Sequence, residues 1–135
     1  RELGVDSRHF NPEEAYFGSL LMSFNVHSFI PMALDTRGYI YYLQGHNHLA
    51  LMDLQVAVEA SEYELKQFDE VLKYEAHRVA DMDLVKRQRH ERAKNVAVIL
   101  YHRSLAYDAT HQVAKAKRDR ERIQELGFSP SPLLH

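Results

Sequence analysis

Hydrophobic and polar positions recur along most of the chain with the three- and four-residue spacing of amphipathic helices. The clearest stripe begins soon after His46 and continues past Ser61, as one buried helix face would. Its members are Leu51, Leu54, Val58, Leu65, Phe68, Leu72, Val79 and Met82. No window alternates with period two between turn residues, so we expect essentially no β-strand. The pattern therefore predicts an all-α fold.

Glycine and proline mark where the helices start and stop. Between residues 46 and 126 the chain has neither, and each is costly inside a helix. Before that stretch, Asn11 and Pro12 can open a first helix over 11–28, and Pro31 a second that Gly45 closes after Gln44. A last helix should span Val113–Leu126 and end at Gly127.

The middle of the chain allows two helix assignments. In the first, two long helices over 47–80 and 84–110 form an extended antiparallel hairpin. In the second, the capping-box pattern Ser61-Glu62-Tyr63-Glu64 starts a new helix, and a further break falls near Asn95. Both place a turn near residues 80–83. We favour the long helices, within an antiparallel array of five to seven helices.

An internal repeat relates two parts of the chain. Residues 66 positions apart match in five pairs: Leu34 with Leu100, Arg37 with Arg103, Gly38 with Ser104, Tyr41 with Tyr107, and Ala50 with Ala116. The offset is close to twice 34 residues, the length of one tetratricopeptide unit.

These residues resemble the tetratricopeptide repeat (TPR) family. The first unit (31–60) carries Leu34, Gly38, Tyr41, Gly45, Ala50 and Ala57 at the family's positions. The second unit (97–127) has Leu100, Ser104, Tyr107 and Ala116, but His111 replaces the turn glycine and Ile123 stands where an alanine is expected. Residues 61–96 depart from the pattern, as a decayed unit or an inserted hairpin. The resemblance implies one TPR-like α-solenoid domain over 1–135, with an extension at 1–10 and a tail at 128–135.

The resemblance also implies a function. In this family the first helix of each unit lines a concave groove, which here would be formed by Asp35, Tyr39, Tyr42, Tyr101, Leu105 and Asp108. We therefore expect a non-enzymatic module that binds a peptide or a partner helix of another protein. The alternative is a spacer or oligomerisation arm in a larger protein.

The pair His46 and His48 in "GHNH" is the most obvious chemical candidate. Two histidines alone are too few for a catalytic zinc site, and no His-Glu-x-x-His pattern occurs. Gly45 can close one helix and Asn47 can cap the next, so we interpret the motif as a turn. Because His102, Ser104 and Asp108 share one helix, they do not form a triad. We expect no catalytic residue, metal or cofactor.

Charge is distributed unevenly. Residues 59–83 carry three Lys/Arg and eight Asp/Glu, whereas 84–135 carry eleven and five. The basic runs 86–94 and 115–122 could contact phosphates, but neither has aromatic residues between its charges. We interpret them as solvated or internally paired helix faces and expect no nucleic-acid partner. In the hairpin, the acidic block should lie beside part of the basic one.

Absent features restrict the class of protein further. The chain has no cysteine, so it has neither disulfides nor thiolate sites, which favours a cytoplasmic location. It contains no apolar run long enough for a transmembrane helix. It starts at Arg1 rather than Met, so we expect a fragment or a processed product. The identity of the partner is not encoded in any motif that we recognise, and oligomerisation is open.

Overall fold

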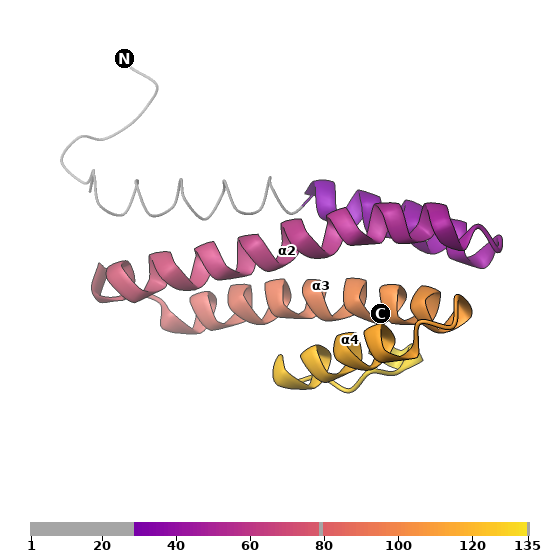
Figure 1. Ribbon diagram of the computed structural model, residues 1–135. Helices are drawn as coiled ribbons and strands as arrows, with labels where there is room; N and C mark the ends of the chain where they lie inside the picture. Colours follow the sequence, from indigo (N-terminus) through magenta and orange to yellow (C-terminus); the bar gives the residue numbers. More distant parts are fainter. Residues whose placement is uncertain (1–28, 79, 135) are drawn as a thin grey trace, which may run out of the picture.

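The computed structural model describes residues 29–78 and 80–134 (Figure 1). No residue in these ranges is in a strand, which confirms the all-α prediction. The α-helices cover residues 29–43, α2 (Asn47–Glu75), α3 (Met82–Ala109) and α4 (Val113–Glu125), with short 3₁₀ turns η1 (Ala76–Arg78) and η2 (Pro132–Leu134). The helix predicted over 11–28 and the extension 1–10 lie outside the described residues.

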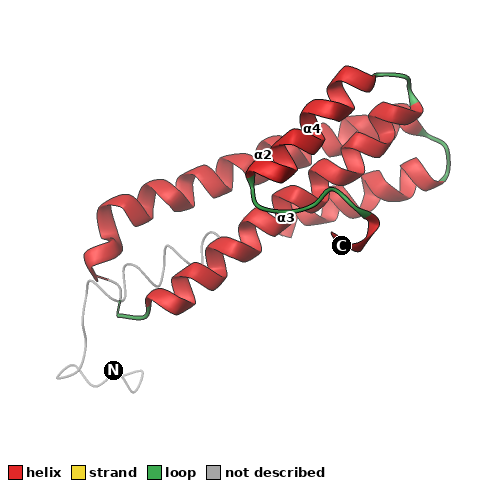
Figure 2. Cartoon of the chain, turned by 90° about the horizontal axis from the view of Figure 1, so that it is seen from below, coloured by secondary structure: helices red, strands yellow, loops and turns green. Residues whose placement is uncertain are grey.

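The helices form an antiparallel array around a central hairpin. α2 and α3 run side by side in opposite directions, and α4 packs against the second part of α3 (Figure 1). Helix 29–43 lies against the first part of α2. Seen from below, the C-terminal tail crosses α3 and ends in η2 (Figure 2). Sequence-adjacent helices are thus also spatial neighbours.

Long helices are formed in the middle of the chain, as we favoured. α2 runs through Ser61 without a break, and the Ser61 hydroxyl donates to the carbonyl oxygen of Val58 at 3.2 Å instead of capping a new helix. α3 likewise runs through Asn95. The described residues consequently form four α-helices, fewer than the expected five to seven.

The turn between α2 and α3 falls close to the predicted position. Asp81 caps α3, and its carboxylate accepts a hydrogen bond from the backbone N–H of Leu84 at 3.0 Å. Met82 was predicted to extend the buried stripe, but it is exposed. The reason is that the chain has already reversed, so Met82 belongs to the first turn of α3 and not to the buried face of α2.

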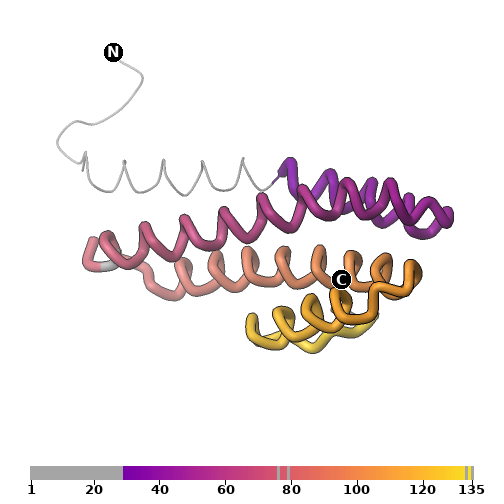
Figure 3. Tube along the Cα trace, viewed as in Figure 1, coloured from indigo at the N-terminus to yellow at the C-terminus, as the bar shows by residue number. Residues whose placement is uncertain are grey.

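Among the described residues, two separate apolar clusters hold the helices together. The larger lies where all the helices meet and includes Leu54, Val58 and Ile99. The smaller contains Phe68 and Val85, with Val71 and Leu72 packed against them. It lies in the part of the hairpin that extends beyond α4 (Figure 3), residues 66–78 and 80–91, which we call the arm. The apolar cluster of the arm is therefore much smaller than the main cluster.

Candidate functional site

The "GHNH" motif is a turn, as predicted. Gly45 has a positive φ of 82°, and the backbone N–H of His46 donates to the carbonyl oxygen of Tyr41 at 2.8 Å, which closes helix 29–43. His46 and His48 are both exposed. We expected Asn47 to cap α2, but it does not. It is already the first helical residue, and its buried Oδ1 accepts no hydrogen bond from the described part of the chain.

The same turn recurs 66 residues later. His111 has a φ of 63°, and the N–H of Gln112 donates to the carbonyl of Tyr107 at 2.8 Å, as that of His46 does to Tyr41. A left-handed conformation is unfavourable for a residue with a Cβ, so His111 adopts it because the helix end requires it. The backbone thus follows the repeat where the sequence departs from it.

Two ion pairs occupy equivalent positions of the 66-residue repeat. Arg37 holds both carboxylate oxygens of Asp53, with contacts of 2.7 and 2.8 Å. Arg103 holds Asp119 in the same way, at 2.9 and 2.6 Å. Both arginines and both aspartates are 66 residues apart. Each pair ties the two helices of its unit together through a bidentate contact.

These contacts also set the acid–base behaviour of the arginines. The hydrogen bond and the charge of Asp53 raise the pKa of Arg37 above its ordinary value. Burial alone would lower the pKa of Arg103, but the hydrogen bond and charge of Asp119 outweigh it and raise the pKa. Both arginines therefore remain charged, and each also lies over a tyrosine ring of its own helix, Tyr41 or Tyr107.

The predicted packing residues lie between the helices. Those that are buried are Gly38, Ala50, Ala57, Leu100, Ser104 and Ala116, together with Ile123. Leu34, Tyr41 and Tyr107 are half-buried. A Cβ on Gly38 would lie 2.8 Å from Cγ of Leu54, so this position of helix 29–43 leaves no room for a side chain. The small residues thus allow close helix approach, as expected.

Two residues of the predicted groove are buried instead of facing a ligand. The carboxylate of Asp35 lies 2.7 Å from Nδ1 of His102, and both side chains are buried between helix 29–43 and α3. Burial also raises the pKa of Tyr101 above its usual range. Asp35 and Tyr101, which we expected in the groove, are thus buried where helix 29–43 and α3 pack together, and neither presents an exposed side chain.

The other predicted groove residues do not form one surface. Tyr39 stacks on the imidazole of His102 with 4.0 Å between ring centroids, and Tyr42 stacks on Tyr39 at 6.0 Å. Leu105 is half-buried and packs against the main core. Asp108 is exposed and forms an ion pair with Arg120 of α4 at 2.8 Å. Only Tyr39 and Tyr42 therefore lie together, as a half-buried aromatic face.

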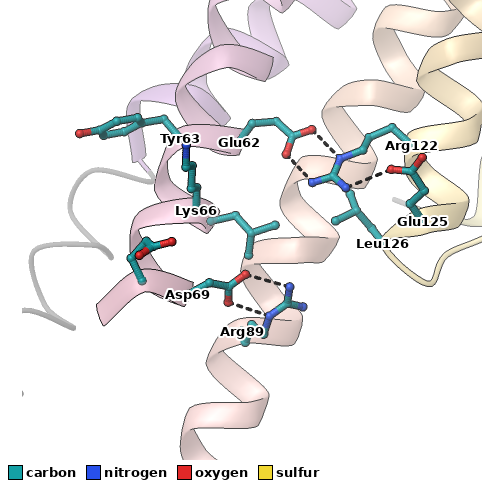
Figure 4. Close-up of a pocket in the computed structure, with 10 residues that line it drawn as sticks. Glu62, Tyr63, Lys66, Asp69, Arg89, Arg122, Glu125 and Leu126 are labelled. Carbon is teal, nitrogen blue, oxygen red and sulfur yellow. Dashed lines mark hydrogen bonds and ion pairs between the residues drawn. The ribbon is translucent and has the colours of Figure 1, made fainter. Parts of the chain in front are cut away.

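A groove lies elsewhere, between the arm and the end of α4 (Figure 4). It encloses about 540 Å³. α2 contributes most of the lining, α3 contributes one residue, and α4 with the residue after it closes the far side. The lining residues are Glu62, Tyr63, Leu65, Lys66, Asp69, Glu70, Arg89, Arg122, Glu125 and Leu126.

Two bidentate ion pairs form the walls of this groove. Arg122 of α4 donates to both carboxylate oxygens of Glu62, each at 2.8 Å. Arg89 of α3 holds Asp69 at 2.8 and 3.0 Å. Lys66 lies between these two pairs along α2, and its ammonium forms no ion pair with the described residues (Figure 4). The guanidinium groups of Arg89 and Arg122 are thus held by carboxylates, whereas the Lys66 ammonium has no ion-pair partner among the described residues.

Sequence reasoning missed this groove and both interhelical aspartates. Asp53 and Asp119 could have been found by extending the repeat alignment by three residues beyond Ala50 and Ala116. The groove had no such signal, because Glu62 and Arg122 are 60 residues apart and only tertiary packing brings them together. His102 was noted in the sequence, but nothing there indicated Asp35 as its partner.

The basic runs are partly paired within the molecule and partly exposed, in line with our interpretation of solvated or internally paired helix faces. Arg89, Arg120 and Arg122 hold carboxylates of other helices. Arg92 is buried, with its guanidinium 4.4 Å from the centroid of the Phe68 ring, and burial lowers its pKa. The acidic second half of α2 therefore does lie beside basic residues of α3 and α4.

Two further findings concern the described residues alone. Among residues 29–78 and 80–134, no three His, Cys, Asp or Glu side chains are grouped so that they could hold a metal ion. In the same part of the chain, no helix combines the length and apolarity that crossing a membrane requires.

Comparison with known proteins gives no relative from which a function could be transferred. No protein-family model, no curated protein and no solved structure matches the chain. The repeated turn, the repeated ion pair and the groove are therefore the observations on which a functional proposal can rest.

Proposed function

We propose that the chain is a non-enzymatic protein-interaction module, a TPR-like array of helix pairs that binds a peptide or partner helix in the groove between the arm and α4. The groove itself is the observation that carries this proposal. It is open and bounded by helices, and the Glu62–Arg122 and Asp69–Arg89 ion pairs link the helices that line it.

The repeated contacts support the array. Arg37–Asp53 and Arg103–Asp119 are equivalent pairs in equivalent helix pairs, and both units end their first helix with a left-handed residue. Stacked helix pairs of this kind build extended surfaces that suit polypeptide ligands. Residues 61–96 then act as an inserted hairpin, whose arm supplies one wall of the groove.

The lining defines what a ligand should offer. Lys66 can receive a carboxylate, and the half-buried Leu126 provides apolar surface beside the buried Leu65. Arg89 and Arg122 are already held by carboxylates, and the hydrogen bonds that Arg122 donates to Glu62 raise the pKa of Arg122 above its ordinary value. A peptide with an acidic residue next to an apolar one would therefore match this groove without disturbing its walls.

Selection from a displayed random-peptide library tests the proposal. We expect enrichment of peptides that pair an acidic with an apolar residue. Lys66→Glu should weaken their binding at least ~10-fold, since like charges then face each other. The matched control is Lys94→Glu, an exposed lysine of α3 outside the groove, which should leave affinity unchanged.

Two results would contradict the groove assignment. One is the absence of any enriched peptide. The other is a peptide whose affinity is insensitive to Lys66→Glu but is lost in Tyr39→Ala, which would move the binding site to the aromatic face formed by Tyr39 and Tyr42.

A further inference from the structure

The outward face of α2 carries an apolar stripe that the other described helices leave exposed. Leu49, Met52, Val56 and Tyr63 are large apolar residues with 42, 56, 51 and 63% of their surface exposed. Ala60, between them, is half-buried. With 100° per residue, all lie within ~40° of Val56 around the helix axis, so they form one continuous face. Tyr63 also lines the edge of the groove, but its ring points away from the Glu62–Arg122 pair (Figure 4).

The repeat provides an internal comparison for this stripe. At the equivalent positions of α4, Leu49 is replaced by Lys115, Met52 by Arg118 and Val56 by Arg122. The second helix of a unit can therefore fold with charges on this face. Its apolar character in α2 is not needed to form the helix pair, and exposed apolar faces of this kind mark interaction sites.

The spacing of the stripe identifies the partner as a second copy of the chain. Relative to Val56, the apolar residues lie at −7, −4, 0, +4 and +7, so the pattern reads the same in both directions. Two copies of α2 packed antiparallel about a two-fold axis at Val56 would bring Leu49 against Tyr63 of the partner subunit, and Met52 against Ala60 of the partner subunit. A two-fold interface requires this self-complementarity.

Charges beside the stripe are compatible with this arrangement. Gln55 and Glu59 lie on the same side of it and are hydrogen-bonded to each other at 2.8 Å. Across the axis, Glu59 would face Gln55 of the partner subunit, so no like charges meet there. We propose that the chain forms a symmetric homodimer through the outward face of α2, with the two-fold axis at Val56.

Sedimentation velocity of the full chain over a range of concentrations is the first test. The wild-type chain should form a reversible dimer. Val56→Arg, which installs the residue found at the equivalent position of α4, should raise the dissociation constant ~100-fold or more, because two arginines meet on the axis. Val56 is exposed, so helicity should be retained in circular dichroism. A wild-type chain that stays monomeric at all concentrations overturns the proposal.

Cross-linking tests the axis and the direction of the helices, since the chain has no cysteine of its own. Val56→Cys should give a disulfide-linked dimer under mild oxidation, and Val113→Cys, equally exposed at the start of α4, should not. A mixture of Leu49→Cys and Tyr63→Cys chains should cross-link more than either variant alone. Equal cross-linking of Val56→Cys and Val113→Cys, or a preference of Leu49→Cys for itself, would exclude the antiparallel dimer.

Discussion

Single residues set how closely the helices of this array approach one another. Gly38 shows this most directly, because a Cβ at this position would meet buried side-chain atoms of Leu54 and Asp53 in α2. Its counterpart in the second unit, Ser104, is buried but has room for a hydroxyl, which donates to the carbonyl of Tyr101 at 2.7 Å. The first unit is therefore the tighter of the two at this position.

Gly38→Val should lower the free energy of unfolding by ~1–3 kcal/mol, since the added side chain must displace the fully buried Leu54. Urea denaturation measures this as a lower midpoint at unchanged slope. Ala33→Val is the control: it adds a valine to an exposed position of the same helix and should cost only a few tenths of a kcal/mol. Equal losses in both variants would mean that Gly38 has no packing role.

At the level of secondary-structure elements, the first helix of both units ends with the same backbone conformation. Gly45 and His111 are equivalent residues, and both have a positive φ, although only one of them is glycine. The turn is thus imposed by the helices that it joins, and the second unit tolerates an unfavourable residue in order to make it. Nothing lies within 4 Å of a Cβ built on Gly45, so strain there comes from the backbone alone.

The two turns predict opposite effects of substitution. His111→Gly should raise the free energy of unfolding by about 0.5–1 kcal/mol, because it removes the steric cost of a left-handed residue. Gly45→Ala should lower the free energy of unfolding by about 1 kcal/mol, because it introduces the same steric cost at a left-handed residue. Thermal unfolding of both variants beside the wild type measures the two shifts. Shifts of the same sign would show that the φ of these residues does not govern stability.

Across the whole molecule, stability should be uneven. Helix 29–43, α2, α3 and α4 share the larger apolar cluster, whereas, among residues 29–78 and 80–134, the arm is held by the smaller cluster around Phe68 and Val85. Regions with few buried apolar contacts open more readily than the rest of a protein. The arm is also one wall of the proposed groove, so its opening would change the shape of the groove.

Native-state hydrogen exchange should reveal this difference. Backbone amides of residues 66–75 and 82–91 should exchange faster than those of 54–60 and 96–104, by on the order of tenfold or more. Measuring exchange at several protein concentrations separates this opening from any effect of dimer formation. Uniform protection along α2 would show that the hairpin opens as one unit and that the arm has no separate stability.

The sequence by itself determined the local structure of this protein. The three- and four-residue spacing, the lack of glycine and proline between 46 and 126, and the glycines Gly45 and Gly127 at helix ends predicted the long α2–α3 hairpin, the "GHNH" turn and the last helix. These features depend on residues close together in the chain, so a pattern can predict them. The 66-residue repeat predicted the small packing residues for a similar reason, since equivalent contacts require equivalent side chains.

Only the tertiary structure decided which polar and aromatic side chains face a neighbour and which face solvent. Asp35 and Tyr101 looked like groove residues but are buried at the contact between units, whereas Glu62 and Arg122 build a groove that no local pattern indicated. Leu49, Met52 and Val56 are apolar, yet they are exposed on the outward face of α2, which the sequence pattern did not indicate. Such assignments depend on how helices are rotated against one another, and that rotation is set by packing between residues far apart in the chain.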